Sequence, residues 1–322
     1  MLAPHPTIRV RVTSVKQEAR DIKLVELGPL DGDSLPLFSA GSHIDLHLAN
    51  GMIRSYSLSN GPDQANRYLV GVKNEEAGRG GSRFIHERLE VGDEIEISAP
   101  RGDFKLEEDA EHSVLIAGGI GITPLMSMSR RLESLGKSWE MHYAARDVEN
   151  AGFVAELRGF GRKVQFYFRK GSRDISARDR VDLAALIKRA PGNTHFYCCG
   201  PSEMIMAFQA ATESLPTTRV HLERFSNEQQ VEKEGTFTVV LQRSGETLEV
   251  CSGQTILEAL LDRGFDVPYS CTEGICSTCQ TTVVSGIPDH RDMILSKEQK
   301  ESNKLIMICC SRSKTDTLVL DI

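Results

Sequence analysis

The stretch Cys271-Thr-Glu-Gly-Ile-Cys276-Ser-Thr-Cys279 decides how this chain is interpreted. Its three cysteines are spaced as C-x4-C-x2-C, and 29 residues separate the last of them from Cys309. This is the plant-type spacing for a [2Fe–2S] cluster, in which each iron takes two thiolates. A short loop can supply three ligands, while the fourth arrives from elsewhere in the fold. We therefore predict Cys271, Cys276, Cys279 and Cys309 as metal ligands.

The small residues of this loop favour the same interpretation. Gly274, Ser277 and Thr278 suit a backbone that bends around sulfides and turns its N–H groups inward to bond them. The alternatives are a zinc site or a set of unrelated buried thiols. Zinc ribbons favour paired C-x2-C knuckles, and the sequence contains one such knuckle. The loop therefore indicates a protein that handles single electrons.

The composition describes an ordinary soluble globular protein of two or three domains. The 322 residues are 40% hydrophobic and 26% charged, with a net charge of −7. This charge argues against nucleic acid and against an anionic membrane surface as partners. Because the sequence shows neither a signal-peptide pattern nor 18 uninterrupted apolar residues, we expect no leader and no transmembrane helix. Eight cysteines in such a chain favour a reducing compartment, and we expect a cytoplasmic protein.

Three segments of the chain follow different patterns. Up to about residue 105, short alternating strands between turns suggest an antiparallel β-barrel with one helix near 82–89. From about 113 to 225, strands and helices alternate, as in a doubly wound α/β sheet. After a polar stretch at 226–235, a hairpin, a helix at 255–263 and a strand near 318–320 predict a compact α+β unit around the cysteines. The strands expected in the middle segment are 113–117, 139–145, 164–169 and 195–198, and its helices are 123–135, 182–189 and 203–213.

Two short motifs in the first segment predict a flavin site. In Arg54-Ser55-Tyr56-Ser57, a cation and hydroxyls suit a flavin phosphate, and an aromatic side chain suits the ring. Alone, this motif could equally be an ordinary strand. The second motif, Gly78-Arg79-Gly80-Gly81-Ser82, precedes a helix expected to start near Phe84, where free N–H groups and the helix dipole attract phosphate. Its alternative is a flexible loop in which Ser82 caps the helix.

Two glycine motifs in the middle segment predict a nicotinamide nucleotide site. Gly118-Gly119-Ile120-Gly121-Ile122-Thr123-Pro124 lies between a strand and a helix, although it is not the G-x-G-x-x-G fingerprint. Thr123 can cap that helix, and Pro124 fits its first turn. Cys199-Gly200-Pro201 follows a later strand, so both motifs fall at the carboxyl edge of a parallel sheet, where such folds bind ligands. Two tight turns without a ligand are the alternative.

Three further residues of this segment bear on the nucleotide. Cys199 is predicted to lie near the reacting nicotinamide carbon, although a buried thiol at a strand end is generically more common. Arg146-Asp147 follows the second strand, where the adenosine ribose is usually read. The acid would repel a 2′-phosphate and favour NADH over NADPH, whereas Arg146 could do the opposite.

Taken together, the motifs resemble the phthalate dioxygenase reductase family, over essentially the whole chain and in the same order. The resemblance also uses Tyr197–Pro201, Asp289-His290-Arg291-Asp292 and Cys309-Cys310-Ser311-Arg312. It implies a multidomain protein with an antiparallel β-barrel flavin domain (1–106), a doubly wound α/β NAD domain (107–226), a linker (227–235) and an α+β plant-type ferredoxin domain of the β-grasp type (236–322).

The resemblance also implies cofactors and roles for individual residues. It implies FMN rather than FAD, a [2Fe–2S] cluster, NADH as electron donor and a Rieske-type oxygenase as acceptor. Nothing in the sequence demands more than a monomer. Arg54 and Ser82 would hold the phosphate, Tyr56 and Ser57 would lie beside the ring, and Phe225 would lie near the flavin, although core packing explains Phe225 nearly as well. Cys199 and Ser57 are the predicted catalytic residues. The predicted cofactor-binding residues are Arg54, Ser55, Tyr56, Ser57, Val72, Lys73, Gly80, Gly81, Ser82, Gly118, Gly119, Gly121, Thr123, Pro124, Arg146, Asp147, Cys199, Gly200, Pro201 and Phe225.

Many members of the family carry glycine after the second loop cysteine, where this chain has Ser277. A side chain there constrains the loop and could alter hydrogen bonding to the sulfides. Two rival functions remain. The first is an FAD-containing reductase of another oxygenase system, in which the ferredoxin domain is commonly N-terminal. The second is an electron carrier or redox sensor without turnover, against which the donor-side motifs argue.

Overall fold

The computed structural model describes residues 7–30, 34–64, 66–76, 78–168, 181–225 and 235–322. The described chain divides into two compact units, Thr7–Arg224 and Phe225–Ile322. Most of the linker expected at 227–235, and Arg169 at the end of an expected strand, lie outside the described residues. Among the described residues, no helix is both long and apolar enough to cross a membrane.

The first unit begins with an antiparallel barrel. Its sheet has the order β4-β3-β6-β1-β2-β5, and a bridge between Leu58 and Val70 joins the two ends. Alternate residues such as Val10, Val12 and Val25 point inward and are fully buried, which is the period-2 pattern seen in the sequence. The helix α1 (Gly81–Arg88) packs near β5. The strands are β1 (Thr7–Ala19), β2 (Ile22–Pro29), β3 (His43–His47), β4 (Ile53–Ser57), β5 (Tyr68–Lys73) and β6 (Glu94–Ser98).

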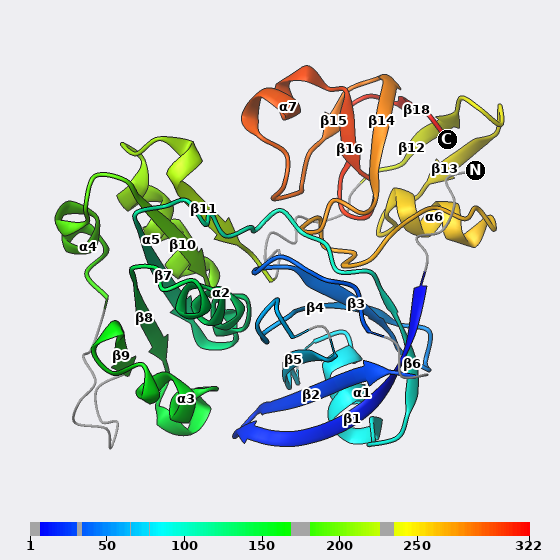
Figure 1. The fold of residues 1–322 in the computed structure, drawn as a ribbon. Helices are drawn as coiled ribbons and strands as arrows, with labels where there is room; N and C mark the ends of the chain where they lie inside the picture. The colour runs from blue at the N-terminus through cyan, green and yellow to red at the C-terminus, as the bar shows by residue number, and fades with distance from the viewer. Residues whose placement is uncertain (1–6, 31–33, 65, 77, 169–180, 226–234) are drawn as a thin grey trace. The chain divides into compact units, whose positions relative to one another are not determined.

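The same unit continues into a five-stranded parallel sheet with the order β11-β10-β7-β8-β9 (Figure 1). One face packs against α2 and α3, and the other against α4 and α5. The strand order reverses between β7 and β10, so a crevice is expected beyond their carboxyl ends. The strands are β7 (His112–Gly118), β8 (Trp139–Ala145), β9 (Val164–Phe168), β10 (Thr194–Cys199) and β11 (Val220–Glu223). The helices are α2 (Ile122–Ser134), α3 (Val154–Gly159), α4 (Leu183–Arg189) and α5 (Ser202–Thr212).

Polar contacts join the barrel to this sheet within the first unit. Arg130 on α2 donates to the carbonyl of Ser59. Glu18, near the turn between β1 and β2, accepts a bond from the N–H of Phe153 at 2.6 Å. The Arg130 guanidinium, which also pairs with Glu156, and the Glu18 carboxylate are both charged, so these two bonds are charge-assisted. The barrel and the parallel sheet are thereby held in one unit.

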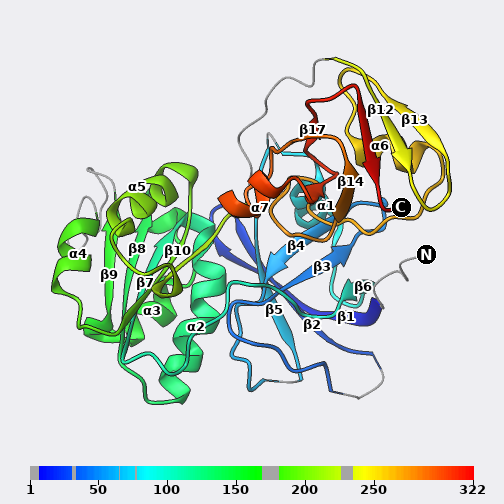
Figure 2. The same ribbon diagram turned by 90° about the horizontal axis from the view of Figure 1, so that it is seen from above.

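The second unit is a mixed sheet with the order β13-β12-β18-β14-β16, in which β12 and β18 run parallel. The helix α6 lies beside the β12–β13 hairpin (Figure 2) and begins with a complete capping box between Thr255 and Glu258. The elements are β12 (Phe237–Leu241), β13 (Thr247–Val250), α6 (Ile256–Asp262), β14 (Gln280–Ser285), β15 (Pro288–Asp289), α7 (Lys297–Ser302), β16 (Leu305–Met307), β17 (Arg312–Ser313) and β18 (Thr317–Leu320).

The predicted fold class is confirmed: an antiparallel barrel, a doubly wound α/β sheet and an α+β ferredoxin unit. The expected helices start within a residue or two of their observed positions. Sequence patterns did not identify β2, β5, α3, β11, β14, β15, α7, β16 and β17 individually. Apart from β2, these elements are two to six residues long, too short to show a clear period.

Candidate functional site

Arg54 and the start of α1 form a phosphate-sized cradle on the barrel. Helix α1 begins at Gly81, with Gly80 as its N-cap at a φ of 85°. A Cβ built on Gly81 would lie 2.6 Å from Cγ and Nε of Arg54, so the guanidinium stem passes directly over the helix start. Arg54 also donates to the carbonyl of Arg79 at 3.1 Å. A cation and a helix N-terminus thus meet at one place, as both flavin motifs predicted.

Ser82 lies inside the first turn of α1, because the helix already begins at Gly81. Its hydroxyl accepts a bond from the N–H of Glu75 at 3.0 Å and makes no capping contact, so the alternative in which Ser82 caps the helix is wrong. The hydroxyl hydrogen can still be donated outward to an anion.

The other predicted flavin residues of the barrel differ in whether they stabilise the fold or line a cavity. The hydroxyl of Ser55 donates to Asp45 at 2.7 Å, so it serves the barrel. Burial raises the pKa of Tyr56 to about 12, and the ring packs against the barrel core. Val72 is completely buried in that core, so its side chain cannot reach a cofactor, while Lys73 lines a large cavity and pairs with Glu75.

The two glycine motifs pack directly on each other at the switch between β7 and β10. A Cβ on Gly118 would lie 2.6 Å from Cδ of Pro201, and one on Gly121 would lie 2.3 Å from the carbonyl oxygen of Cys199. A Cβ on Gly200 would lie 3.0 Å from Cα of Gly118. Part of the glycine requirement therefore comes from contact between the two turns, as well as from the space needed by a nucleotide.

Thr123 does not cap α2, contrary to the expectation. The helix begins at Ile122, one residue earlier than predicted, and the Thr123 hydroxyl donates to the carbonyl of Ile120 at 3.0 Å. Its side chain is buried beside Gly71 of the barrel. Pro124 lies in the first turn of α2, as predicted, and is also buried. Neither residue lines the cavity found at this edge of the sheet.

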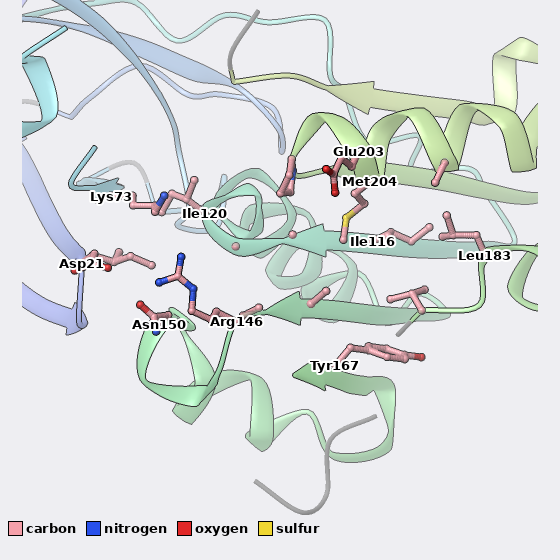
Figure 3. A pocket seen from close by; sticks show the side chains of 18 residues that line it. Asp21, Lys73, Ile116, Ile120, Arg146, Asn150, Tyr167, Leu183, Glu203 and Met204 are labelled. Carbon is pink, nitrogen blue, oxygen red and sulfur yellow. The ribbon is translucent and has the colours of Figure 1, made fainter. Parts of the chain in front are cut away.

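A cavity of about 1050 Å³ opens at this carboxyl edge, between the sheet and the barrel (Figure 3). It is large enough for a dinucleotide. Glycines and Pro201 from the two turns line one part, and side chains after β8 line another. Lining residues include Asp21, Lys73, Gly118, Gly119, Ile120, Arg146, Asn150, Tyr167, Leu183, Pro201, Glu203 and Met204.

The Arg146-Asp147 pair separates into two roles. Arg146 lines the cavity, whereas Asp147 does not. The Asp147 carboxylate caps a short 3-10 turn (Val148–Asn150), accepting bonds from the Asn150 N–H at 3.0 Å and from its side-chain amide at 2.7 Å. These bonds lower the pKa of Asp147, although burial acts in the opposite direction. The acid is therefore a structural cap.

Glu223, which the sequence analysis missed, connects the two predicted catalytic residues. Ser57, the last residue of β4, donates to the Glu223 carboxylate at 3.3 Å. Glu223 also pairs with Cys199 in the register of β10 and β11. Burial raises the pKa of Glu223 to about 8, so the group is a protonated acid at neutral pH. Other atoms of Glu223 are partly exposed, but the carboxyl group itself is enclosed, and its burial raises the pKa. A single acid in Leu222-Glu223-Arg224 carries no motif, so only the pairing of β11 with β10 could have revealed it.

Cys199 itself is fully buried and does not line the cavity. Burial, with Glu223 beside it, raises the pKa of its thiol well above the ordinary value. It is therefore an uncharged thiol beneath the crevice. It is suited to packing against a ring, and not to acting as a nucleophile.

The cysteine loop of the second unit is shaped around its sulfurs. The N–H groups of Glu273 and Ile275 point at the Cys271 sulfur at 3.4 and 3.5 Å, and the N–H of Cys271 points at Cys276 at 3.5 Å. Neighbouring thiols of Cys276 and Cys309 hydrogen-bond to Cys271 and lower its pKa, while Cys279 contacts Cys309. The four predicted ligands thus meet at one place, with backbone donors turned inward as expected.

This donor set consists of four thiols that lie near one another. Among the described residues, no group of three or more cysteine, histidine or carboxylate side chains surrounds a position for a single metal ion. A [2Fe–2S] cluster needs only two thiolates at each iron. Four thiols, two for each iron, therefore fit a binuclear cluster in number and in chemistry.

The backbone of the loop is left-handed at Thr272, Gly274 and Ser277, with φ of 57°, 71° and 60°. Gly274 is also packed tightly, because a Cβ there would lie 2.4 Å from the sulfur of Cys310. Cys310, which is not a predicted ligand, thus supports the loop from behind.

The Asp289–Asp292 run differs from the solvated turn that it suggests in isolation. Asp292 is 1% exposed, and its carboxylate accepts bonds from the N–H groups of Ile294 and Leu295 at 3.2 and 2.8 Å. The N–H of Met293 donates to Gly274 in the cysteine loop at 3.0 Å. The run therefore braces the loop. Phe225 is partly exposed, and its predicted place beside the flavin stays a prediction.

Comparisons with known proteins agree with this arrangement. Three family models match in order: an oxidoreductase FAD-binding domain at residues 9–106, an oxidoreductase NAD-binding domain at 115–210, and a 2Fe-2S iron-sulfur cluster binding domain at 239–314. The phenoxybenzoate dioxygenase subunit beta of Ectopseudomonas oleovorans is 45% identical over 98% of this chain and 97% of its own. The tetrachlorobenzoquinone reductase of Sphingobium chlorophenolicum is 45% identical over the full length of both chains. The solved structure of a phthalate dioxygenase reductase superposes with a TM-score of 0.79, at 37% identity over 98% of each chain.

Proposed function

The chain belongs to the phthalate dioxygenase reductase family, and on that premise we propose that it carries electrons from NADH through FMN and a [2Fe–2S] cluster to a Rieske-type oxygenase. It is an oxidoreductase of the kind that serves oxygenase systems. The observation that carries the proposal is the presence, in one chain, of the Arg54 cradle, the crevice at the two glycine turns and the group of four thiols formed by the cysteine loop and Cys309. An electron carrier alone would not need the first two.

The bound groups would supply the redox chemistry. A flavin accepts a hydride and releases electrons singly, and the cluster accepts one electron at a time. One NADH thus reduces two equivalents of a one-electron acceptor and yields NAD+ and one proton. The protein's residues bind, orient and exclude water.

Arg54 and the first turn of α1 would hold the flavin phosphate. They bring a cation and the free N–H groups of a helix start together, and both attract an anion. A single terminal phosphate, as in FMN, fits such a site. The matching family model is described as FAD-binding, so the identity of the flavin is decided by experiment.

Glu223 and Ser57 would act where the flavin ring meets the nicotinamide. Because the acid is protonated at neutral pH, it adds no negative charge where a hydride arrives. Ser57 is oriented by its bond to Glu223 and can turn its hydroxyl lone pairs toward the reacting edge. We propose Ser57 as a catalytic residue in this sense, with Glu223 as the group that positions it. Cys199, also predicted as catalytic, would support the crevice from beneath and not touch the reacting atoms.

The cysteine loop would hold the cluster with Cys271, Cys276, Cys279 and Cys309. Inward N–H groups stabilise the electron-rich sulfurs of the reduced state and so tune the potential. The proposed domains are 1–106, 107–226 and 236–322. The acidic net charge of −7 suits a basic patch on the oxygenase.

The deciding experiment is an absorption spectrum of the purified protein before and after anaerobic NADH, with the released flavin identified by chromatography. Flavin and iron–sulfur bands that bleach with NADH, together with FMN in the supernatant, support the proposal. Released FAD transfers the chain to the rival reductase type. Cluster absorption without flavin or NADH response leaves an electron carrier and refutes the reductase. Turnover with a purified Rieske oxygenase then tests the partner.

A further inference from the structure

The loop after β8, where folds of this kind bind the adenosine ribose, carries a cation and an acid, Arg146 and Asp147. Two charged residues follow β8, and an acid at this point normally bonds the ribose 2′-hydroxyl and repels a 2′-phosphate. In this protein the acid, Asp147, is occupied as the cap of the turn that ends at Asn150, with both of its bonds to that residue between 2.7 and 3.0 Å. Both bonds end on the same carboxylate oxygen and hold Asp147 in its cap, and Asp147 does not line the cavity.

Arg146 occupies the place that the acid leaves. It lines the cavity and is exposed, and its guanidinium extends past Asn150 toward the space between Asp21 and Lys73 (Figure 3). A guanidinium offers several N–H donors in a planar fork that matches a phosphate group. Lys73 adds a second cation to the same part of the cavity, although it is paired with Glu75.

From this geometry we infer that Arg146 forms a binding site for the 2′-phosphate of NADPH, so that the enzyme uses NADPH as well as NADH. The inference rests on the proposed function and changes its donor specificity. Arg146 faces the cavity and would attract the phosphate, whereas Asp147 is held in its own cap and does not line the cavity.

Two acids of the cavity limit how far this preference can go. Asp21, from the turn between β1 and β2, lies on the same side of the cavity as Arg146 and can accept bonds from ribose hydroxyls (Figure 3). Glu203 lies at the other glycine turn, beside Pro201, and faces a different part of the nucleotide. At this end of the cavity one acid, Asp21, accompanies two cations, Arg146 and Lys73. The protein should therefore use NADPH and NADH, and NADH is not excluded.

The test compares the nucleotides in anaerobic stopped-flow reduction of the holoprotein. In the wild type, the second-order rate constants for flavin reduction by NADPH and NADH should differ by less than about tenfold. Arg146→Ala should lower the NADPH value by about 10- to 100-fold, as expected for loss of a charge-assisted bond, and the NADH value by less than about threefold. Arg162→Ala removes an exposed arginine that does not line the cavity and should change neither.

A binding measurement separates this inference from the proposed function. Titration calorimetry of the oxidised protein with adenosine 2′,5′-bisphosphate and with 5′-AMP should show tighter binding of the bisphosphate, and Arg146→Ala should abolish the difference. If NADH fails to reduce the flavin, the proposed function falls, and the calorimetry still decides the role of Arg146. If NADH reduces the flavin but the bisphosphate binds no more tightly than 5′-AMP, the inference is wrong. It is also wrong if Arg146→Ala lowers the rate constants for NADPH and NADH by factors within threefold of each other.

Discussion

The two glycine turns beneath the cavity and the cysteine loop of the ferredoxin unit solve the same problem in opposite ways. Each must bring backbone close to a bound group. In the turns, Gly118, Gly121 and Gly200 contact each other's backbone, so the protein itself holds the shape. In the cysteine loop, Thr272 and Ser277 are left-handed although they carry side chains, and N–H groups end on sulfurs. The first site is complete as folded protein, whereas the second is shaped for an inorganic group that it must hold.

The largest effect should come from removing one sulfur. Cys276→Ala should abolish electron transfer to one-electron protein acceptors, because one iron would lose half of its protein ligands. Flavin reduction by NADH should stay within about twofold of the wild type, since the flavin and nucleotide residues lie in the other unit. Stopped-flow spectra and cytochrome c reduction measure the two steps. Cys251→Ala, which removes an exposed thiol from the same unit, is the control. Loss of both steps would contradict the assignment of separate sites.

A methyl group at the glycine contact should have the next largest effect. In Gly121→Ala, the added Cβ would lie 2.3 Å from the carbonyl oxygen of Cys199, where only backbone could move. We expect a loss of at least about 100-fold in the rate of flavin reduction by NADH, because the turn and the nucleotide would shift. Gly159→Ala, at the end of α3 with open space around its Cβ, should leave the rate unchanged. Equal effects of the two variants would show that the turns are not a tight contact.

These two predictions also mark how much the sequence could reveal. The spacing of Cys271, Cys276 and Cys279 reflects covalent geometry around iron, so it is readable without a fold. The glycine turns were readable because a strand–glycine–helix order places them at one sheet edge. The directions of short polar side chains could not be predicted from the sequence. Asp147 caps its own turn, and Thr123 bonds to Ile120, because local backbone donors and acceptors compete with a ligand for short polar side chains.

Glu223 was invisible for a different reason. Its role arises from pairing between β11 and β10 and from a contact with Ser57, which lies 166 positions earlier in the chain. No local pattern encodes such a contact. Its raised pKa likewise depends on burial by elements from both the barrel and the parallel sheet.

Glu223→Gln should have an intermediate effect on rate and a clear effect on pH dependence. The pKa of Glu223 is about 8 in the folded protein, against an ordinary value of 4.5. Below pH 4.5 the acid is protonated in both states. Between pH 4.5 and 8 the unfolded chain releases a proton that the folded protein keeps, so the free energy of unfolding falls as pH rises. Above pH 8 the penalty is constant.

The glutamine variant, which cannot ionise, should lose this part of the pH dependence and be the more stable protein above pH 8. Its rate of flavin reduction should fall by about tenfold, and its rate should no longer change near pH 8. Thermal unfolding and stopped-flow reduction from pH 5 to 9 measure both effects. Glu111→Gln, an exposed acid before β7, is the matched control. A wild-type profile that does not change through pH 8 would contradict a protonated Glu223.

The smallest effect concerns the left-handed serine of the cysteine loop. Ser277 has a φ of 60°, a conformation that costs a residue with a Cβ roughly 1–2 kcal/mol and that glycine adopts freely. Ser277→Gly should therefore stabilise the cluster-loaded ferredoxin unit by about 0.5–1 kcal/mol, after the greater chain entropy of glycine is subtracted. Loss of cluster absorbance on heating or in denaturant measures this change.

Ser277→Ala separates backbone strain from the hydroxyl group. Alanine keeps the Cβ, so it keeps the strain, and it should leave the stability near the wild-type value. If both variants stabilise the loop equally, the hydroxyl group and not the left-handed backbone is the source of the cost. If neither does, the sulfurs and irons hold the loop so firmly that its torsional strain has no influence on cluster loss. The contrast with the glycine turns would then be one of rigidity, with the cysteine loop the more rigid site once it is loaded.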